Sequence, residues 1–209
     1  MRFVLGSQSP ARLAVLRAAG LDPRVVVSGV DEDAVIAASA GLHSGQVVAA
    51  LAMAKAEAVV ATLAGERGDA VVMGCDSMLL IDGELVGKPG TVEIARRRWQ
   101  AMAGNSGALL TGHAVIRVKD GEAIEKTSGT EATKVHFSTP DADELEAYLA
   151  SGEPLQVAGG FTLDGLGGWF VKGVEGDPSS VIGISLSLTR TLLAEVGVRV
   201  TDLWQPPTS

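Results

Sequence analysis

The pattern of hydrophobic and polar positions predicts strands and helices that alternate along most of the chain. A short apolar run at the N-terminus predicts a strand, and the Ser9-Pro10 pair behind it marks the start of a helix that Gly20 ends. A continuous apolar run before Gly74 is typical of a buried strand. The elements expected in this part of the chain are strands at residues 2–5, 24–28 and 70–74 and helices at residues 9–20 and 44–63.

Two turn sequences predict hairpins in the middle of the chain. Asp82-Gly83 separates two short apolar runs, and Asp120-Gly121 separates two long ones. Thr91 is a plausible cap for the helix between the two hairpins. The elements expected here and towards the C-terminus are strands at residues 78–81, 84–86, 109–119 and 122–137 and helices at residues 91–103, 140–150 and 185–196.

The segment of residues 152–176 contains eight glycines and is expected to be a loop that lines a cleft, because glycine permits tight turns and close backbone approach. Helices and strands alternate without the strict period of a doubly wound fold, and two hairpins interrupt them. The predicted fold class is therefore α/β (mixed α+β), a mixed sheet flanked by helices. No internal repeat or low-complexity linker divides residues 1–209, which are expected to form a single domain, either as one large unit or as two lobes that share a cleft.

The composition is that of an ordinary globular protein. The chain has 209 residues, of which 46% are hydrophobic and 20% charged. Its one cysteine, Cys75, excludes an intramolecular disulfide and fits the reducing cytoplasm. The N-terminal apolar run is too short for a signal peptide, and Lys55 and Glu57 interrupt the longest apolar stretch, so no membrane insertion is expected.

The formal net charge of −8 argues against general nucleic-acid binding, since a phosphate-backbone binder normally has a basic surface. The net charge does not exclude binding of a small polyanion. It requires only a few basic side chains at one place, and a divalent cation can supply the rest of the positive charge.

The turn after the first predicted strand is a candidate phosphate site. Residues 6–12 read Gly-Ser-Gln-Ser-Pro-Ala-Arg, which brings backbone N–H groups, the hydroxyls of Ser7 and Ser9 and the side chain of Arg12 to a helix N-terminus. Helix N-termini bind anions because their first N–H groups lack partners and the helix dipole is positive there. The same residues would also suit a plain cap at Ser9 with a solvated Arg12.

A carboxylate, Asp76, follows the apolar run of residues 70–74 and is expected at the end of a buried strand, where α/β folds commonly place catalytic groups. It could bind a hard divalent cation, take a proton from an attacking water, or only start a turn. The acidic loop expected at Asp31, Glu32 and Asp33 offers further oxygen ligands, or a solvated surface.

Two lysines have unusual neighbours. Lys88 stands between Gly87 and Pro89 in a stiff turn that can direct its charge at a phosphate. Lys55 interrupts the apolar helix sequence MAKAEAVVA, either as a functional cation or as a side chain that reaches the surface along its aliphatic stem. With Arg12, these cations and the nearby acids make a metal and phosphate site possible.

Several other chemistries lack their sequence patterns. The chain contains neither G-x-x-x-x-G-K-[ST] nor a G-x-G-x-x-G between a strand and a helix. His43, His113 and His136 are dispersed, so neither a histidine-ligated zinc site nor a serine hydrolase triad is expected and each is interpreted as structural. Cys75 is interpreted as an inert core residue.

Four segments, in this order, resemble the Maf family of nucleotide pyrophosphatases, also described as septum-formation inhibitor proteins. The resemblance covers nearly the whole chain. The segments are LGSQSPARLAVLRAAGL, LAMAKAEAV, GCDSMLLIDGELVGKP and GGWFVKGVEGDPSSVIGISL.

The resemblance implies two lobes with the active site in a cleft between them, as in the house-cleaning inosine triphosphate pyrophosphatases. It also implies that a nucleoside triphosphate is hydrolysed to a nucleoside monophosphate and pyrophosphate with Mg²⁺ or Mn²⁺, and that the protein could be a homodimer. By motif position, Asp76 is implied to be the catalytic carboxylate, which activates water or holds the metal, and Glu32 is implied to help bind the metal. The residues implied to bind substrate phosphates are Ser7, Arg12, Lys55 and Lys88.

The chain departs from the family at three places. Ala11 and Gly107 replace an arginine and a histidine that relatives often have. Residues 157–167, VAGGFTLDGLG, are more similar to CAGSFKSEGLG of the 7-methyl-GTP branch than to DKAGAYGIQG of the dTTP and UTP branch. Asp164 stands at that branch's glutamate, one methylene shorter, which makes it a candidate for reading the nucleobase.

Two function classes are thus expected to compete. The first is an enzyme that removes noncanonical or modified nucleotides. The second is a regulator of cell division that binds a nucleotide without turnover, and the intact set of Asp76, Lys55 and Lys88 argues against it.

Overall fold

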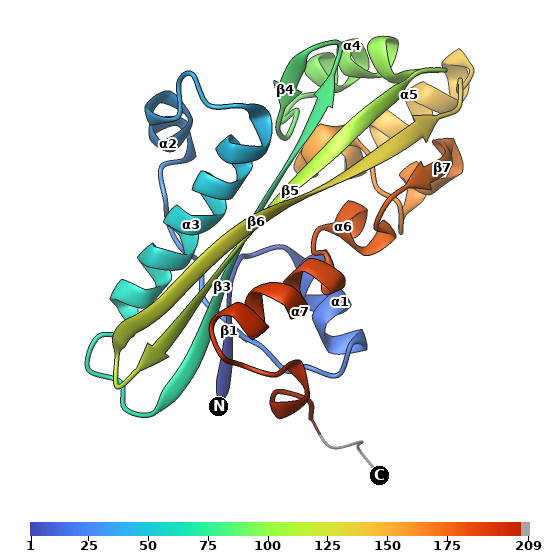
Figure 1. The fold of residues 1–209 in the computed structure, drawn as a ribbon. Helices are drawn as coiled ribbons and strands as arrows, with labels where there is room; N and C mark the ends of the chain where they lie inside the picture. Colours follow the sequence, from blue (N-terminus) through green and yellow to red (C-terminus); the bar gives the residue numbers. More distant parts are fainter. Residues whose placement is uncertain (206–209) are drawn as a thin grey trace. The chain divides into compact units, whose positions relative to one another are not determined.

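The computed structural model describes residues 1–205 (Figure 1). The chain divides into two compact units. Of the described residues, unit 1 comprises Met1–Asp76, Thr111–Glu131 and residues 183–205. Unit 2 comprises Ser77–Leu110 and Ala132–Ile182. The chain therefore enters and leaves unit 2 twice, and the strands around residues 76, 110 and 131 contribute residues to both units.

The described strands form one mixed seven-stranded sheet, which confirms the predicted fold class. The order is β2-β1-β3-β5-β6-β7, and β4 pairs with β3. Strand β1 pairs in parallel with β2 and β3, whereas β4 and β7 are antiparallel to their partners. The strands are β1 (Arg2–Gly6), β2 (Arg24–Val25), β3 (Asp69–Ile81), β4 (Glu84–Val86), β5 (Ser106–Lys119), β6 (Glu122–Phe137) and β7 (Val171–Glu175).

Six of the seven described α-helices begin at a side-chain cap that the sequence supplies. Ser9 and Thr91 accept hydrogen bonds from the N–H groups of Arg12 and Ile94, as predicted for α1 and α4. The α-helices are α1 (Pro10–Ala18), α2 (Glu32–Ala38), α3 (Ser44–Thr62), α4 (Val92–Met102), α5 (Ala142–Ala150), α6 (Pro178–Ile182) and α7 (Leu186–Glu195). The 3₁₀ helices are η1 (Glu153–Gln156), η2 (Ala158–Gly160), η3 (Leu166–Phe170) and η4 (Val200–Asp202).

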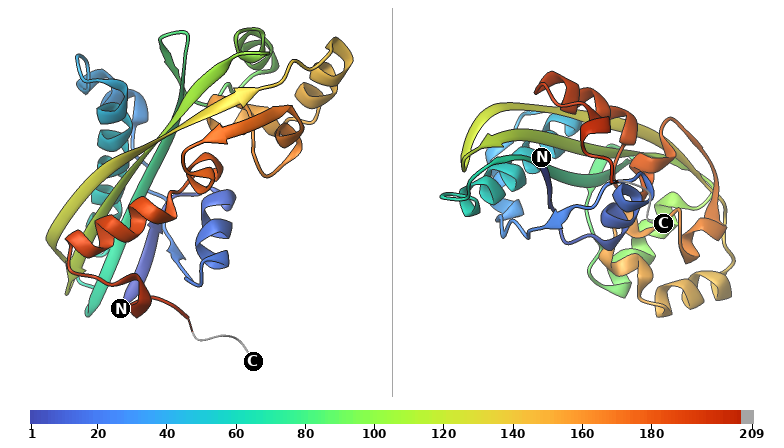
Figure 2. Two further views of the ribbon diagram at one scale, coloured as in Figure 1. Left: turned by 45° about the vertical axis from the view of Figure 1, so that its right-hand side comes forward. Right: turned by 90° about the horizontal axis from the view of Figure 1, so that it is seen from below.

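The core of unit 1 lies on both faces of its strands (Figures 1 and 2). Phe3 and Leu5 of β1 belong to a cluster that includes α1 and α7, whereas Val4, between them, belongs to a cluster that includes α3. Successive side chains of a strand point to opposite faces, so a strand covered on both faces needs a continuous apolar run. This is the physical reason for the sequence pattern of β1 and β3.

Unit 2 is built around an aromatic cluster. The buried Trp99 of α4 makes edge-on contacts with Phe137, Tyr148 and Phe170, each at a ring-centroid distance of 5.8 Å. The indole Nε1 donates a hydrogen bond to Gly160 O at 2.9 Å, which anchors the glycine-rich segment to this core.

Helix α3 approaches β3 and β5 so closely that two glycines are required. A Cβ atom at Gly74 would lie 2.1 Å from Ala52 O, and one at Gly112 would lie 2.1 Å from Val48 O. Real Cβ atoms do not come that close to a backbone oxygen. These glycines therefore determine how near α3 packs to the sheet.

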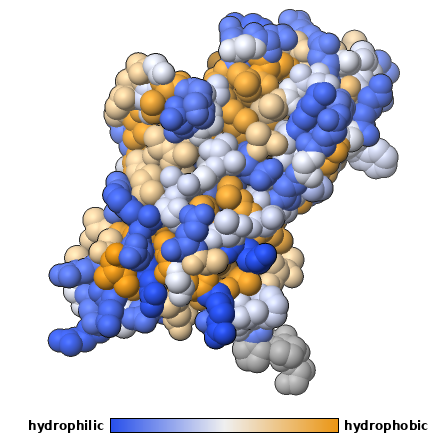
Figure 3. Space-filling model, viewed as in Figure 1, coloured by the Kyte–Doolittle hydropathy of each residue, from blue (hydrophilic) through white to orange (hydrophobic). Residues whose placement is uncertain are grey.

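Among the described helices, α3 is long and apolar enough to cross a membrane. Seven of its residues are buried, and its Lys55 is paired with carboxylates inside unit 1. The helix is therefore the core helix of unit 1, as its broken apolar pattern predicted. On the face shown in Figure 3, hydrophobic residues lie among hydrophilic ones.

Two predictions about the site region were wrong. Residues 70–74 and 78–81 belong to one strand, β3, so Asp76 lies inside a strand and not at its end. The polar Cys75-Asp76-Ser77 sequence predicted a break, but all three residues continue the strand. The acidic segment is not a loop, because Asp31 caps α2 by accepting the Ala34 N–H at 3.0 Å.

Other boundaries also differ. Strand β2 is limited to Arg24–Val25, and β5 begins at Ser106, three residues before the predicted start. The segment of residues 152–176 is not a continuous loop, since it contains three 3₁₀ helices and β7. The short helix α6 was not predicted. Its five residues are too few to show a helical period.

Candidate active site

Lys55 of α3 makes two ion pairs inside unit 1. Its Nζ lies 2.5 Å from Asp76 Oδ1 and 2.7 Å from Glu32 Oε1. Lys55 and Asp76 are each 8% exposed, whereas the Glu32 side chain is 54% exposed. Buried charges are expensive unless they are paired. Lys55 therefore does not reach for solvent, and it joins two other residues predicted for the site, Asp76 and Glu32.

The packing of α3 explains why these groups meet. Gly74 faces α3 at Ala52 and Ala56, and Asp76 lies two residues further along β3, so it points to the same face. Lys55 directly precedes Ala56 on α3, so the packing of this helix against β3 places the Lys55 ammonium next to the Asp76 carboxylate. Glu32 is the first residue of α2 and forms an ion pair with the same ammonium.

The turn after β1 holds Arg12 beside this cluster. The register pairs Gly6 of β1 with Gly74 of β3, which brings the turn next to Cys75. Arg12 donates from Nη1 to Cys75 O at 2.8 Å and to Ser7 Oγ at 3.1 Å, and from Nε to Gly183 O at 2.9 Å. Arg12 is therefore fixed by three acceptors and is not simply solvated.

The donor set fits a divalent cation that is shared with a substrate. Oxygens of Asp76 and Glu32 converge on one point, at present occupied by the Lys55 ammonium. Among residues 1–205, no group of three or more His, Cys, Asp or Glu side chains could hold a metal by itself. Mg²⁺ is commonly bound by one or two carboxylates together with substrate phosphates and water. Asp76 and Glu32 supply that number.

Lys88 and Asp164 belong to unit 2. Lys88 is exposed in the connection between β4 and α4, next to the buried Pro89. Asp164 is exposed in the turn that precedes η3. That these two side chains join the cluster of unit 1 stays a prediction from the sequence.

Gly183 and His113 were not predicted for the site, although both support it. Gly183 O accepts the Arg12 Nε hydrogen bond, and two residues later the N–H of Ser185 donates to His113 Nε2 at 2.8 Å. His113 Nδ1 lies 2.9 Å from Thr111 O, so this nitrogen carries the proton. The buried imidazole is structural, as predicted, and it fixes the segment that holds Arg12. No motif in one sequence reveals a backbone acceptor of this kind.

A second histidine forms a chain of contacts in unit 2. His136 Nδ1 lies 2.7 Å from Ser106 Oγ, and its Nε2 lies 2.6 Å from Glu175 Oε1. The three residues come from the neighbouring strands β5, β6 and β7. Cross-strand side-chain pairing accounts for the contacts, and they tie the edge strand β7 to the sheet.

Cys75 lies within β3 and is fully buried, and burial raises the pKa of its thiol to about 11. Because the thiolate is the reactive form, we expect a thiol-specific disulfide reagent at pH 8 to label the native protein at least about 100-fold more slowly than the urea-unfolded chain. Absorbance of the released thiolate measures both rates. Equal labelling of the two forms would contradict the buried position of Cys75.

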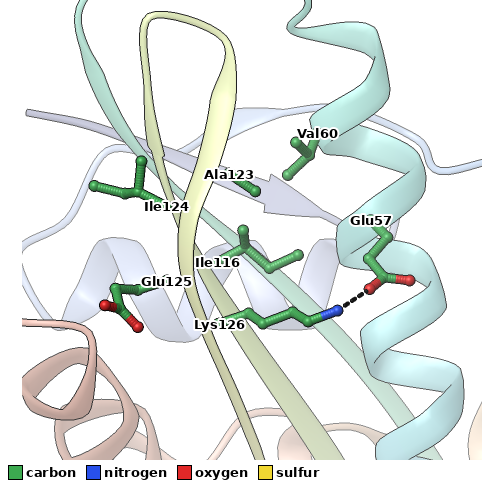
Figure 4. A pocket seen from close by; sticks show the side chains of 7 residues that line it. All are labelled: Glu57, Val60, Ile116, Ala123, Ile124, Glu125 and Lys126. Atoms are coloured by element: carbon green, nitrogen blue, oxygen red, sulfur yellow. Dashed lines mark hydrogen bonds and ion pairs between the residues drawn. The ribbon is translucent and has the colours of Figure 1, made fainter.

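The hollow in Figure 4 lies in unit 1 but away from these residues. It is lined by α3 and by the β5–β6 hairpin, and an ion pair of 2.9 Å between Lys126 Nζ and Glu57 Oε1 crosses it. None of the predicted site residues contributes to it. Exposed ion pairs of this kind contribute little to stability.

Lys55 lies between two carboxylates and beside the turn that contains Ser7 and Arg12, an arrangement suited to a phosphate-bearing substrate. The family of Maf-like proteins matches residues 2–196, so the chain belongs to the Maf family. Its relatives include proteins named nucleoside triphosphate pyrophosphatase from three bacteria. The one from Saccharopolyspora erythraea is 63% identical over 208 residues, which cover 99% of both chains. Those from Rhodococcus jostii and Mycolicibacterium smegmatis are 64% and 62% identical over 204 residues, covering 97% of this chain and 95% and 97% of theirs.

Proposed function

We propose that this protein hydrolyses a nucleoside triphosphate to a nucleoside monophosphate and pyrophosphate. The observation that carries the proposal is the buried Lys55, which joins Asp76 and Glu32 beside the Ser7 and Arg12 turn. Membership of the Maf family and the name of its close relatives support the same reaction.

In the proposed reaction, a water oxygen forms a bond to the α-phosphorus while the bond from that phosphorus to the bridging oxygen breaks. Asp76 accepts the proton that the water loses, and pyrophosphate leaves with the electron pair of the broken bond. Arg12 and Ser7 offer hydrogen-bond donors to phosphate oxygens, and Lys55 places a positive charge where negative charge increases. Lys88 is proposed to bind the outer phosphates.

Asp76 and Glu32 are proposed to hold one Mg²⁺ or Mn²⁺. When bound, such an ion polarises phosphate oxygens and offsets the charge of the leaving pyrophosphate. The Lys55 ammonium offsets the repulsion between the two carboxylates in its absence. We also propose that the protein acts in the cytoplasm, in keeping with its single buried cysteine.

The reaction can be tested by product analysis in ¹⁸O-labelled water. We expect equal amounts of nucleoside monophosphate and pyrophosphate, with the label in the monophosphate. Release of orthophosphate and a nucleoside diphosphate would contradict cleavage between the α and β phosphates. Label in the pyrophosphate would move the attack to the β-phosphorus.

We further propose that Asp164 favours a 7-methylguanine base over thymine or uracil. The Watson–Crick edge of 7-methylguanine offers neighbouring N–H donors on a cationic ring, which a carboxylate can accept as a charge-assisted pair. The pyrimidines offer only one such donor.

Lengthening or neutralising this carboxylate tests the base preference. Asp164→Glu should raise the ratio of kcat/KM for 7-methyl-GTP to that for dTTP or UTP, and Asp164→Asn should lower it about tenfold, the scale of one hydrogen bond to a charged group. Competition assays with paired substrates measure the ratio. An unchanged ratio in both variants would remove Asp164 from base recognition.

A further inference from the structure

One carboxylate in unit 2 organises the turn that carries Asp164. Glu153, the first residue of η1, accepts hydrogen bonds from Thr162 Oγ1 at 2.6 Å and from Gly167 N at 3.0 Å on its Oε1. Its Oε2 accepts a third hydrogen bond, from Leu166 N at 3.0 Å. The donors lie 9 to 14 residues further along the chain, so a single side chain brings both ends of the turn together.

The turn is shaped to fit around this carboxylate. A Cβ atom at Gly165 would lie 2.6 Å from Glu153 Oε2, and one at Gly167 would lie 2.6 Å from Thr162 N. Both distances are shorter than real Cβ contacts. At Gly167 the clash is with backbone, so glycine is required there, whereas a side chain at residue 165 would displace the Glu153 carboxylate. The glycines that predicted a loop in the sequence therefore permit a compact turn over Glu153.

The Glu153 contacts bracket the exposed Asp164. One donor, Thr162, precedes Asp164 by two residues, and the others, Leu166 and Gly167, follow it by two and three residues. Asp164 therefore projects from a short segment that is fixed on both sides.

The outer ends of the segment are anchored as well. Phe161 packs on Phe137 at a ring-centroid distance of 5.0 Å, and Phe170 packs on Trp99 at 5.8 Å. Both ends of the segment that contains the turn are therefore anchored in the aromatic core of unit 2. Between those points, hydrogen bonds to the Glu153 carboxylate hold it together.

Glu153 is suited to this role by its charge. Burial raises its pKa, but the hydrogen bonds from Thr162, Leu166 and Gly167 lower it more, and the net pKa lies below the ordinary value of a glutamate. The side chain is therefore an ionised acceptor near neutral pH. Charge-assisted hydrogen bonds of this kind are stronger than those between neutral groups.

We infer that Glu153 is a positioning residue for base recognition: it holds the turn of residues 162–167 so that Asp164 presents its carboxylate to the nucleobase. The inference rests on the proposed role of Asp164. Glu153 itself has no proposed contact with the substrate. It acts by reducing the number of conformations that Asp164 samples before the substrate arrives.

The test combines hydrogen exchange with substrate discrimination. Glu153→Gln keeps the shape of the side chain but replaces one carboxylate oxygen by an NH₂ group. This group is a donor and cannot accept the hydrogen bonds that the oxygen accepts from a backbone N–H or from the Thr162 hydroxyl. We expect amide exchange in residues 161–168 to accelerate about tenfold, and discrimination between 7-methyl-GTP and dTTP to fall about tenfold, mainly through KM. Glu153→Asp, which is one methylene short, serves as a second variant in case Glu153→Gln folds poorly. Asp143→Asn, at an exposed acid in the first turn of α5, is the matched control.

Comparison with Asp164→Asn separates the possible failures. If Glu153 acts through Asp164, Asp164→Asn should lower discrimination without faster exchange, and adding Glu153→Gln to it should lower discrimination little further. Unchanged exchange or unchanged discrimination in both Glu153 variants, with Asp164→Asn effective, would overturn the positioning role alone. No effect of Asp164→Asn on discrimination would overturn base recognition by Asp164, and the inference about Glu153 with it.

Discussion

Replacing Asp76 by asparagine should lower kcat about a thousandfold while the chain stays folded. Asparagine has nearly the same shape, and its amide oxygen can still accept a hydrogen bond from Lys55. It cannot take a proton from water, and it is a poor ligand for a divalent cation. General-base catalysis alone contributes about 10²–10⁴ to a rate, so the loss should appear in kcat more than in KM. Pyrophosphate release at saturating substrate measures it.

The control for this variant is Glu57→Gln, on the same helix as Lys55. Glu57 forms an exposed ion pair with Lys126 and belongs to no part of the proposed site. Glu57→Gln should keep wild-type kcat, and both variants should unfold cooperatively. Wild-type turnover by Asp76→Asn would remove Asp76 from the mechanism.

Replacing Gly74 by alanine should have the largest effect on stability. The new Cβ would lie 2.1 Å from Ala52 O and 2.8 Å from Ala56 N, both backbone atoms that cannot rotate away. Helix α3 must then move off β3, which opens the core of unit 1 and separates Lys55 from Asp76. Overpacking a core costs about 1–3 kcal/mol and can cost more, so we expect a loss of about 3 kcal/mol in the free energy of unfolding. Urea denaturation followed by circular dichroism measures it.

Gly173→Ala provides the matched comparison. Gly173 also lies in a strand, but a Cβ atom there would meet no heavy atom within 4 Å. This variant should unfold within about 0.5 kcal/mol of the wild type, as surface substitutions usually do. If Gly74→Ala were equally stable, the close approach of α3 to β3 would be wrong.

Most of the fold could be predicted from one sequence because its signals are local. The Asp82-Gly83 and Asp120-Gly121 turns each have positive φ at both residues, as the predicted two-residue hairpins need. Ser9 and Thr91 cap the helices they were expected to cap. The apolar run before Gly74 identified a strand that is covered on both faces.

The errors arose where one local sequence pattern is compatible with two different structures. A polar residue after an apolar run can end a strand or point into a site, and at Asp76 it does the second because Lys55 supplies the opposite charge. A cluster of acids can be a solvated loop or a favourable first turn of a helix, and Asp31 and Glu32 form the latter.

The candidate site could be predicted in part, because some of its residues are recognisable from the local sequence. Ser7, Arg12, Glu32, Lys55 and Asp76 carry recognisable chemistry. Within unit 1, Arg12 donates to Ser7 and to the carbonyl of Cys75, which precedes Asp76, and Lys55 forms ion pairs with Asp76 and Glu32. The residues that hold the candidate site of unit 1 in place, Gly74 and Gly183, could not be identified in this way, and neither could Glu153 in unit 2. Gly74 is needed because its strand packs against α3, Gly183 contributes only its backbone carbonyl, and Glu153 accepts three hydrogen bonds from residues further along the chain. Each of these roles depends on which distant segments pack together, and one sequence does not show that.

The most direct test of the central claim is to measure pyrophosphate release and nucleotide binding side by side, with and without Mg²⁺ or Mn²⁺. The panel should contain 7-methyl-GTP, dTTP, UTP and the four standard ribonucleotides. We predict metal-dependent release of pyrophosphate from at least one of these, abolished by a chelator and restored by the metal. Tight binding without release of pyrophosphate under any condition would contradict an enzyme and would support a nucleotide-binding regulator.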